Sequence, residues 1–320
     1  MNYTPRYLQH CNNETLRKKA LEIHKLLECC TLCPRRCKIN RLNNEKGICN
    51  VGALPVVCSY LAHHGEEPPI SGTQGSGTVF FSYCNLKCAY CQNHHFSQEG
   101  EGEEISIEKL TKIMLYLQKC GCHNINLVTP THVMPQILMA LASAVADGLT
   151  IPIVYNTSGY ELPEVIRLLN GIVDVYLVDM RYAQTEYSKK YSSAGDYPTH
   201  NQESLKEMYR QVGDATFNED NLITHGIIVR HLVLPNNISG TDTIMKFISE
   251  HISKNTYISL MSQYHPYYHA HRYPEIARRI TKEEYEDAIA CLKKYGLENG
   301  WIQDSYGLEC FAGVNIKKNI

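Results

Sequence analysis

From residue 78 onward, short apolar segments alternate with segments of helical periodicity, and this alternation constrains the fold more than any other feature. The segments I-P-I-V-Y-N at 151–156 and V-D-V-Y-L-V-D at 173–179 are typical, with Val and Ile prominent. Such alternation indicates a parallel sheet with helices outside it. The predicted strands are 78–83, 124–129, 151–156, 173–179, 226–234 and 256–261. The predicted helices are 106–119, 133–146, 162–169, 202–211, 241–251 and 281–295.

The periodicity is compatible with two α/β architectures, an open doubly wound sheet and a barrel. In both of them the loops that carry the chemistry converge at the carboxyl ends of the strands. Candidate functional residues are therefore those that follow the predicted strands directly.

Three cysteines, Cys84, Cys88 and Cys91, follow the first predicted strand in the sequence C-N-L-K-C-A-Y-C. One explanation is that the three cysteines lie on one face of a helix and are buried as small apolar side chains. Polar residues surround them, however, and no capping residue precedes such a helix. Three thiolates can also bind zinc, with water as the fourth ligand. A cubane iron–sulfur cluster explains more simply why there are three cysteines, because they hold three of its four irons and leave one iron open for another ligand.

Composition excludes several classes of protein. The chain has 320 residues, 43% of them hydrophobic, which suffices for a sizeable core and excludes a disordered tail protein. The formal net charge is −2 without a long run of one sign, so we expect no wholesale binding to nucleic acid or to a membrane surface. A stretch of about 18 apolar residues and a secretion signal are both absent, so we expect no membrane segment and a cytoplasmic location. In that reducing compartment, 14 cysteines indicate metal ligands or redox groups rather than disulfides.

A second group of cysteines follows a predicted amphipathic helix at 13–28. Pro and Gly interrupt the segment 31–77 throughout, so it is predicted to be irregular, and a bound metal would supply stability that it otherwise lacks. Zinc, an accessory iron–sulfur cluster and reduced cysteines without metal remain open as alternatives, and Cys29 or Cys58 can replace one ligand. The predicted ligands of this second metal site are Cys30, Cys33, Cys37 and Cys49.

The sequence C-N-L-K-C-A-Y-C, with the aromatic Tyr90 directly before its last cysteine, resembles the motif of the radical S-adenosylmethionine (SAM) enzymes. The resemblance implies a 4Fe-4S cluster on Cys84, Cys88 and Cys91, with Tyr90 beside the cofactor. In that family the open iron chelates the amino and carboxylate groups of SAM. One electron from the cluster then splits the sulfonium into methionine and a 5′-deoxyadenosyl radical, which removes a hydrogen atom from the substrate.

The resemblance also implies the fold, a partial (β/α)6 TIM-like barrel with a cysteine-rich N-terminal extension. On this basis we divide the chain into three parts. Residues 1–75 form an N-terminal helix and cysteine-rich cap, 76–270 form the partial barrel, and 271–320 form a C-terminal helical extension.

A narrower resemblance concerns an uncharacterised group related to the pyruvate formate-lyase activating enzymes. It is carried, in this order, by C-T-L-C-P-R-R-C-K-I-N-R, Y-C-N-L-K-C-A-Y-C-Q-N, N-L-V-T-P-T-H and V-R-H-L-V-L-P. It covers most of residues 30–265 and is weak at 185–222 and over the final fifty residues. Activases of this kind abstract an α-hydrogen from a glycine of a partner glycyl-radical enzyme. The resemblance therefore implies such a partner and an electron donor such as flavodoxin or ferredoxin.

The end of the second predicted strand departs from the activase pattern. Activases usually carry Gly-Gly-Glu there, which meets the amino group of SAM, whereas this chain has Thr129-Pro130-Thr131-His132. Hydroxyls and carbonyls of Thr129 and Thr131 would then accept the ammonium hydrogens. The alternative is that Thr131 only caps the helix that starts near Val133.

The third and fourth strand ends supply the remaining residues that the resemblance assigns to the cofactor. Asn156 and Ser158 belong to N-T-S-G-Y, which is similar to a Thr/Asn-rich segment that contacts the methionine part of SAM in activases. A plain turn is the alternative there. Asp179-Met180-Arg181 resembles the activase Asp-Leu-Lys, with a forked donor in place of a point charge. A structural ion pair is the alternative for Asp179 and Arg181.

Two further sets of residues lie near the ends of the last two strands. Arg230 and His231 are adjacent within one strand, so only one of them can face the barrel interior. The loop that carries His265, His269 and His271 is interpreted as a surface or substrate-facing loop, with a second metal site as the alternative.

Three alternatives to a glycyl-radical activase stay open. The first is radical SAM modification of another peptide or a small molecule. The second is a non-catalytic, metal-binding interaction module, although the polar strand ends argue against it. The third is modification of RNA, for which the basic patch of Arg35, Arg36 and Lys38 is too small.

Overall fold

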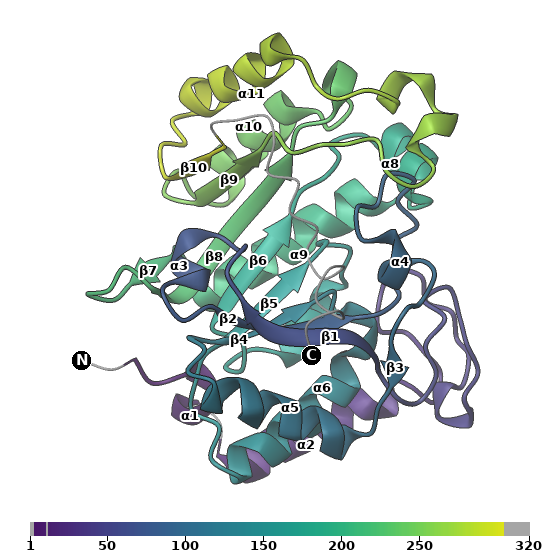
Figure 1. The fold of residues 1–320 in the computed structure, drawn as a ribbon, viewed down its shortest axis with the longest axis vertical. Coiled ribbons are helices and arrows are strands. Elements are labelled where there is room, and N and C mark those ends of the chain that lie inside the picture. Colours follow the sequence, from purple (N-terminus) through teal and green to yellow (C-terminus); the bar gives the residue numbers. More distant parts are fainter. Residues whose placement is uncertain (1–2, 11, 304–320) are drawn as a thin grey trace.

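The computed structural model describes residues 3–10 and 12–303, and it is a mixed α/β structure around one large sheet (Figure 1). The strands are β1 (Val56–His63), β2 (Ser76–Phe81), β3 (Glu103–Glu104), β4 (Ile125–Val128), β5 (Ile153–Thr157), β6 (Val175–Asp179), β7 (Thr216–Phe217), β8 (Ile223–Leu232), β9 (Tyr257–Met261) and β10 (Gly300–Ile302). The α-helices are α1 (Arg6–Gln9), α2 (Asn13–Lys25), α3 (Pro68–Ser71), α4 (His94–Ser97), α5 (Ile107–Lys119), α6 (Met134–Ala146), α7 (Pro163–Leu168), α8 (Thr185–Ser192), α9 (Tyr197–Val212), α10 (Thr241–His251) and α11 (Lys282–Tyr295).

Six parallel strands form the centre of the sheet in the order β2-β4-β5-β6-β8-β9, and each of them coincides with a strand predicted from the sequence. β10 extends the sheet beside β9, whereas β1 and β3 extend it antiparallel beyond β2. The path of strands runs from β10 to β3 without closing on itself in the described part of the chain. The predicted partial barrel of about six strands is therefore confirmed.

Alternate residues of the central strands face two different cores. Tyr155, Tyr176 and Val178 belong to the large outer core that the surrounding helices cover. Val154 and Leu177 instead belong to a small interior core. This alternation follows from the two-residue period of a strand, and burial of both faces explains why these strands are apolar throughout.

The short helix α3 lies against the interior of the sheet. Its Ile70 packs in the interior core with Val175 and Ile228, so this part of the barrel is filled by side chains. Polar residues occupy the barrel interior farther along the same strands, at Asn156, Asp179 and Arg230. The functional groups are therefore gathered toward the carboxyl ends of the strands.

The segment predicted to be irregular contains a strand, and that prediction is corrected here. β1 runs antiparallel to β2, with Leu61 opposite Thr78 and His63 opposite Ser76. Most residues of β1 are half-buried on both faces, so the sequence lacks the clean alternation that marks a strand. Helix α8 and strand β10 were likewise not predicted.

The N-terminal helix is part of the same helical layer as the barrel helices. α2 packs on α6, and α6 packs on α5, at the lower side of the molecule in Figure 1. The division of the chain at residues 75 and 270 stays a prediction. None of the helices described is long and apolar enough to cross a membrane.

Candidate active site

The loop that carries Cys84, Cys88 and Cys91 leaves the carboxyl end of β2, as predicted. Backbone hydrogen bonds hold it against the end of α8, because Lys87 N donates to Ser192 O at 3.1 Å and Ala89 N donates to Tyr191 O at 2.7 Å. Cys84 and Cys88 are buried, Cys91 is half-buried, and all three are free thiols. The loop is thus fixed by elements about a hundred residues away in the sequence.

Each of the three sulfur atoms has a hydrogen-bonding group beside it. The amide of Leu86 donates to Cys84 Sγ at 3.4 Å, and the hydroxyl of Ser192 donates to Cys88 Sγ at 3.1 Å. The hydroxyl of Ser97 lies 3.0 Å from Cys91 Sγ. Donors of this kind support a thiolate in a site that is shielded from water.

Burial disfavours the thiolate form of Cys84 and Cys91 when no metal is bound. Burial raises the pKa of the Cys84 thiol to about 12, and it raises the pKa of Cys91 as well. The free thiols of Cys84 and Cys91 are therefore protonated at neutral pH. A bound metal must displace those protons, so metal binding here depends on pH.

Arg181 connects the cysteine loop to the carboxyl end of β6. Its Nη1 donates to Cys88 Sγ at 3.5 Å, and its Nη2 donates to Asp179 Oδ2 at 2.6 Å. Burial by itself would raise the pKa of Asp179, but Arg230 and Arg181 together hold that pKa below its usual range. Asp179 is therefore an anion between two cations, as the structural ion-pair alternative predicts, and one of those cations touches a cysteine sulfur.

Arg230, and not His231, faces the barrel interior. Its Nε donates to Asp179 Oδ1 at 2.8 Å and its Nη2 donates to Asn156 Oδ1 at 2.6 Å. His231 lies on the other face of β8, where its ring contacts Met180 O at 2.7 Å and the Thr241 hydroxyl at 3.0 Å. Of the two adjacent residues, Arg230 is thus the one that faces the barrel interior.

Glu66 enters the barrel from the segment between β1 and α3. Its carboxylate lies 3.5 Å from Arg230 Nη1 and accepts a 2.9 Å hydrogen bond from Asn126 Nδ2. Burial raises the pKa of Glu66, and Arg230 and Asn126 offset part of that effect. Sequence analysis missed this residue because it follows β1, the strand that was not predicted.

Among the buried polar atoms that have no partner in the described residues, two lie at neighbouring strand ends close to the cysteine loop. They are Ser158 Oγ and Arg181 Nε. Ser158 lies just after β5 and Arg181 just after β6, on neighbouring strands. Buried polar groups are normally satisfied, so such atoms indicate a place where a ligand with acceptor groups fits.

Tyr90 is buried in a group of aromatic rings. Its ring packs edge-on against Tyr264 and Tyr182, with centroids 5.6 Å and 6.4 Å away. Tyr90 therefore anchors the last turn of the cysteine loop against two other parts of the barrel. The wall that these rings form excludes water from one side of the loop.

The two threonines after β4 have different environments. Thr129 has a φ of 60°, a conformation that a β-branched residue rarely adopts and that is found mostly at functional sites. The Thr131 hydroxyl donates to Glu161 Oε1 at 2.5 Å. The helix after it starts with no side-chain cap, so the interpretation of Thr131 as a helix cap is wrong.

Glu161 is a buried carboxylate that sequence analysis missed. It accepts hydrogen bonds from the hydroxyls of Thr131, Thr157 and Tyr155, the last two at 2.6 Å and 3.1 Å. Burial still raises its pKa to about 7. Nothing in the sequence marks it, because its three donors come from two different strand ends.

The histidines of the loop after β9 do not converge on one point. Within the described residues, the one set of possible ligand atoms that all lie within 4.8 Å of one another belongs to His94, His95 and Glu99. The alternative of a metal site on His265, His269 and His271 is therefore not supported. The loop instead holds the cysteine motif, because His269 N donates to Ala89 O at 2.8 Å.

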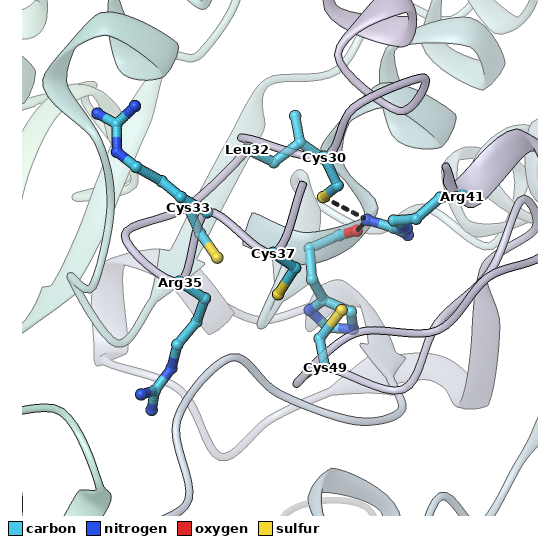
Figure 2. Close-up of a pocket in the computed structure, with 9 residues that line it drawn as sticks. Cys30, Leu32, Cys33, Arg35, Cys37, Arg41 and Cys49 are labelled. Atoms are coloured by element: carbon cyan, nitrogen blue, oxygen red, sulfur yellow. Dashed lines mark hydrogen bonds between the residues drawn. The ribbon is translucent and has the colours of Figure 1, made fainter. Parts of the chain in front are cut away.

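The structure brings the second group of cysteines together around one pocket (Figure 2). Figure 2 shows the sulfurs of Cys33, Cys37 and Cys49 turned toward a common space, with Cys30 beside Arg41. The exposed Cys29 does not line this pocket. The lining residues are Cys30, Leu32, Cys33, Arg35, Arg36, Cys37, Arg41, Cys49 and His132.

Comparison with protein families assigns the central part of the chain. Residues 78–248 match the model of the radical SAM superfamily, a span that covers β2 to α10 and includes all three cysteines of the first motif. An uncharacterized protein of Methanocaldococcus jannaschii is 32% identical over 279 residues, which are 84% of this chain and 75% of that protein.

The solved structures that resemble this chain share little sequence with it. A radical SAM methyltransferase from Sphaerobacter thermophilus is 14% identical, with 72% of this chain and 67% of that chain covered and a TM-score of 0.45. Methylornithine synthase is 14% identical, with 76% of each chain covered and a TM-score of 0.46. The anSMEcpe structure with bound AdoMet is 12% identical, with 67% and 58% covered and a TM-score of 0.44.

Proposed function

Because this chain belongs to the radical SAM superfamily, whose members use a 4Fe-4S cluster and S-adenosylmethionine, we propose that it cleaves SAM reductively at a cluster on Cys84, Cys88 and Cys91. The observation that carries the proposal is the loop after β2, which presents three free thiols. Three ligands leave one of four irons available for SAM.

The residues around the loop fit that cofactor. Arg181 Nε and Ser158 Oγ are buried donors without partners, and a carboxylate or hydroxyl group of a ligand would satisfy them. The Arg181 guanidinium next to Cys88 offers a positive charge to the carboxylate of SAM. When bound, the cluster and SAM supply a 5′-deoxyadenosyl radical that removes a hydrogen atom from a substrate.

The remaining site residues hold these groups in place. Asp179 accepts a hydrogen bond from Nη2 of Arg181 and so orients it. Arg230 in turn holds Asp179 within the barrel, and Glu66 pairs with Arg230. Ser192 donates to Cys88 Sγ, and the rings of Tyr90 and Tyr264 shield the loop from water. Exclusion of water protects a radical from side reactions. A low-potential donor such as flavodoxin or ferredoxin would supply the electron.

The finer proposal is that the hydrogen atom comes from the α-carbon of a glycine in a partner glycyl-radical enzyme. It is supported by the ordered motifs that resemble activating enzymes, including Asp179-Met180-Arg181 in place of their Asp-Leu-Lys. The departure at Thr129-Pro130-Thr131 weakens the likeness at one strand end. The rest of the assignment, cleavage of SAM, does not depend on this choice of substrate.

The cleavage is tested with protein reconstituted anaerobically with iron and sulfide, reduced, and supplied with SAM. We expect 5′-deoxyadenosine from the wild type and none from Cys88→Ala. The matched control is Cys120→Ala, because Cys120 is an exposed free cysteine at the end of α5. Equal product from wild type and Cys88→Ala would refute the proposal, and so would no product from a fully loaded and reducible cluster.

The choice of substrate is tested by adding a purified glycyl-radical enzyme of the pyruvate formate-lyase type to the same reaction. We expect the electron paramagnetic resonance (EPR) doublet of a glycyl radical on the partner. With a partner deuterated at its glycine α-carbons, deuterium should appear in 5′-deoxyadenosine. SAM cleavage without either signal would favour modification of another peptide or a small molecule.

A further inference from the structure

Four cysteines of the N-terminal segment line one pocket, although the first and the last are 19 positions apart in the sequence. Cys30, Cys33 and Cys49 are buried and Cys37 is half-buried, and all are free thiols. Arg36 and Lys38, on either side of Cys37, have φ values of 39° and 54°. Left-handed backbone at residues other than glycine is strained and is typical of ligand-binding loops. Strained backbone thus flanks Cys37, the half-buried cysteine of the pocket.

The pocket also contains a buried cation that has no anionic partner among the described residues. Arg41 is 1% exposed and hydrogen-bonds to Gly52 O at 3.1 Å and to His132 O at 2.7 Å. Its Nη1 also lies 4.0 Å from Cys30 Sγ. No carboxylate of the described residues forms an ion pair with it. A buried charge is normally paired, so the missing anion is expected in the pocket that Arg41 lines.

A second polar group in the pocket is unsatisfied. His132 lines it, and its Nδ1 is buried without a partner among the described residues. The other ring nitrogen, Nε2, lies 2.9 Å from Ser82 O and must carry a proton, because a carbonyl only accepts. Four thiols, an unpaired arginine and an unpartnered imidazole nitrogen thus surround one space.

The sulfurs of the pocket are not gathered as closely as a single zinc ion requires. Zinc bound to four thiolates at about 2.3 Å holds their sulfurs about 3.8 Å apart. Within the described part of the chain, no three of these four sulfurs lie within 4.8 Å of one another. A cubane cluster instead places each cysteine on a different iron atom, at separate corners of a cube, and needs a wider set of ligands.

We propose that this pocket holds a second 4Fe-4S cluster, bound by Cys30, Cys33, Cys37 and Cys49, that exchanges single electrons with the Cys84 site. Four thiolates occupy all four irons, so this cluster has no open position for SAM and serves only as an electron carrier. The buried Arg41 balances part of its negative charge.

The side chain of Arg35 connects the two sites. Arg35, between two of the pocket cysteines, donates through Nε to Asn85 O at 2.8 Å, and Asn85 is the neighbour of Cys84. Its Nη2 donates to Ser192 O at 3.4 Å, and the hydroxyl of Ser192 donates to Cys88 Sγ. One electron would pass from a reduced flavodoxin or ferredoxin to the pocket cluster and then to the Cys84 cluster. This transfer, unlike the binding site, rests on the proposed function.

The binding site is tested in a variant that lacks Cys84, Cys88 and Cys91, all replaced by Ala and reconstituted anaerobically. We expect about four irons and four sulfides per chain, the EPR signal of a reduced cubane, and no stoichiometric zinc. One zinc per chain without iron, or no metal, would overturn the proposal. The result does not depend on SAM cleavage, because the first motif is absent from this variant.

Two substitutions in the same background separate ligands from neighbours. Cys33→Ser should lose the iron, whereas Cys29→Ala should keep it, because Cys29 is exposed and outside the pocket. Loss of iron from both variants, or from neither, would contradict the assigned ligands. Circular dichroism shows whether Cys33→Ser is folded, and the iron count of the parent variant stands independently of it.

Electron transfer is tested by stopped-flow reduction in a Cys33→Ser/Cys37→Ser variant that retains the first motif. We expect the variant to hold about four irons rather than about eight and to lose the fast phase of reduction by flavodoxin. Reduction by the small reagent dithionite should be unchanged. An unchanged fast phase with flavodoxin would overturn the role as a carrier while leaving both the cluster site and the proposed function in place.

Discussion

The guanidinium of Arg181 lies between a carboxylate and a sulfur: it donates to Asp179 Oδ2 at 2.6 Å and to Cys88 Sγ at 3.5 Å. Asp179 in turn accepts a 2.8 Å hydrogen bond from Arg230. A charge network inside the barrel thus ends on a cysteine of the first motif. Perturbing it should affect both stability and cofactor binding, and the two effects can be measured separately.

Replacing Arg181 should weaken cofactor binding. Arg181→Met removes the donor to Cys88 and the cation offered to the carboxylate of SAM, so we expect SAM affinity to fall by about 10–100-fold. Arg181→Lys keeps the charge without the forked donor geometry, so its SAM affinity should lie between those of the wild type and Arg181→Met. Equilibrium dialysis of SAM against the reconstituted proteins measures this, and an affinity unchanged in Arg181→Met would contradict it.

Replacing Asp179 should destabilise the fold. Asp179→Asn leaves the guanidinium groups of Arg181 and Arg230 without the anion that both contact, and breaking a buried ion pair costs about 3–5 kcal/mol. Anaerobic urea unfolding measures the loss. The control is Glu108→Gln, which breaks an exposed ion pair with Lys112 and should leave the unfolding free energy unchanged. Equal stability of the two variants would show that the barrel network is not structural.

Glu161 should make stability depend on pH. Its pKa is raised by burial to about 7 in the folded protein, whereas an unfolded glutamate titrates near 4.3. Between these values the folded state binds more protons than the unfolded state, so stability falls as the pH rises from about 4.3 to about 7. The whole effect is about 4 kcal/mol, and above that window the loss is complete.

The variant Glu161→Gln should remove this slope, because Gln accepts hydrogen bonds from the same hydroxyls without ionising. Urea unfolding at pH 5 and pH 7.5 gives the difference for wild type and variant. Glu164→Gln, on the nearby surface, should keep the wild-type slope, since the Glu164 side chain is half-exposed beside Arg36. A wild-type slope in Glu161→Gln would mean that other groups set the pH dependence.

Gly47 leaves room for a pocket cysteine. A Cβ at this position would lie 2.8 Å from Cys37 Sγ and 3.0 Å from Cys37 Cβ, so Gly47→Ala must displace that side chain. We expect this variant to lose iron from the pocket while it keeps the cluster on the first motif. Gly195→Ala is the control, because its Cβ would meet nothing closer than Lys189 Cβ at 3.5 Å. Full iron content in Gly47→Ala would count against Cys37 as a ligand.

Much of the barrel was predictable because its strands are buried on both faces. Segments such as Ile153–Thr157 and Val175–Asp179 can be identified as strands from their apolar sequences alone, without any tertiary context. β1 was missed for the opposite reason, since it is an outer strand whose residues are mostly half-buried on both faces. With β1 missed, the position of Glu66 within the barrel could not be predicted either.

The sequence by itself determined the alternation of the six central strands with helices and the two groups of cysteines, because periodicity and motif spacing are local properties of the chain. Only the tertiary structure decided that Arg230 faces inward toward Asp179, that Glu66 joins them, and that Arg35 links one group of cysteines to the other. These contacts join residues that are 50 or more positions apart. Their geometry depends on how the whole barrel packs, and no local pattern of side chains encodes it.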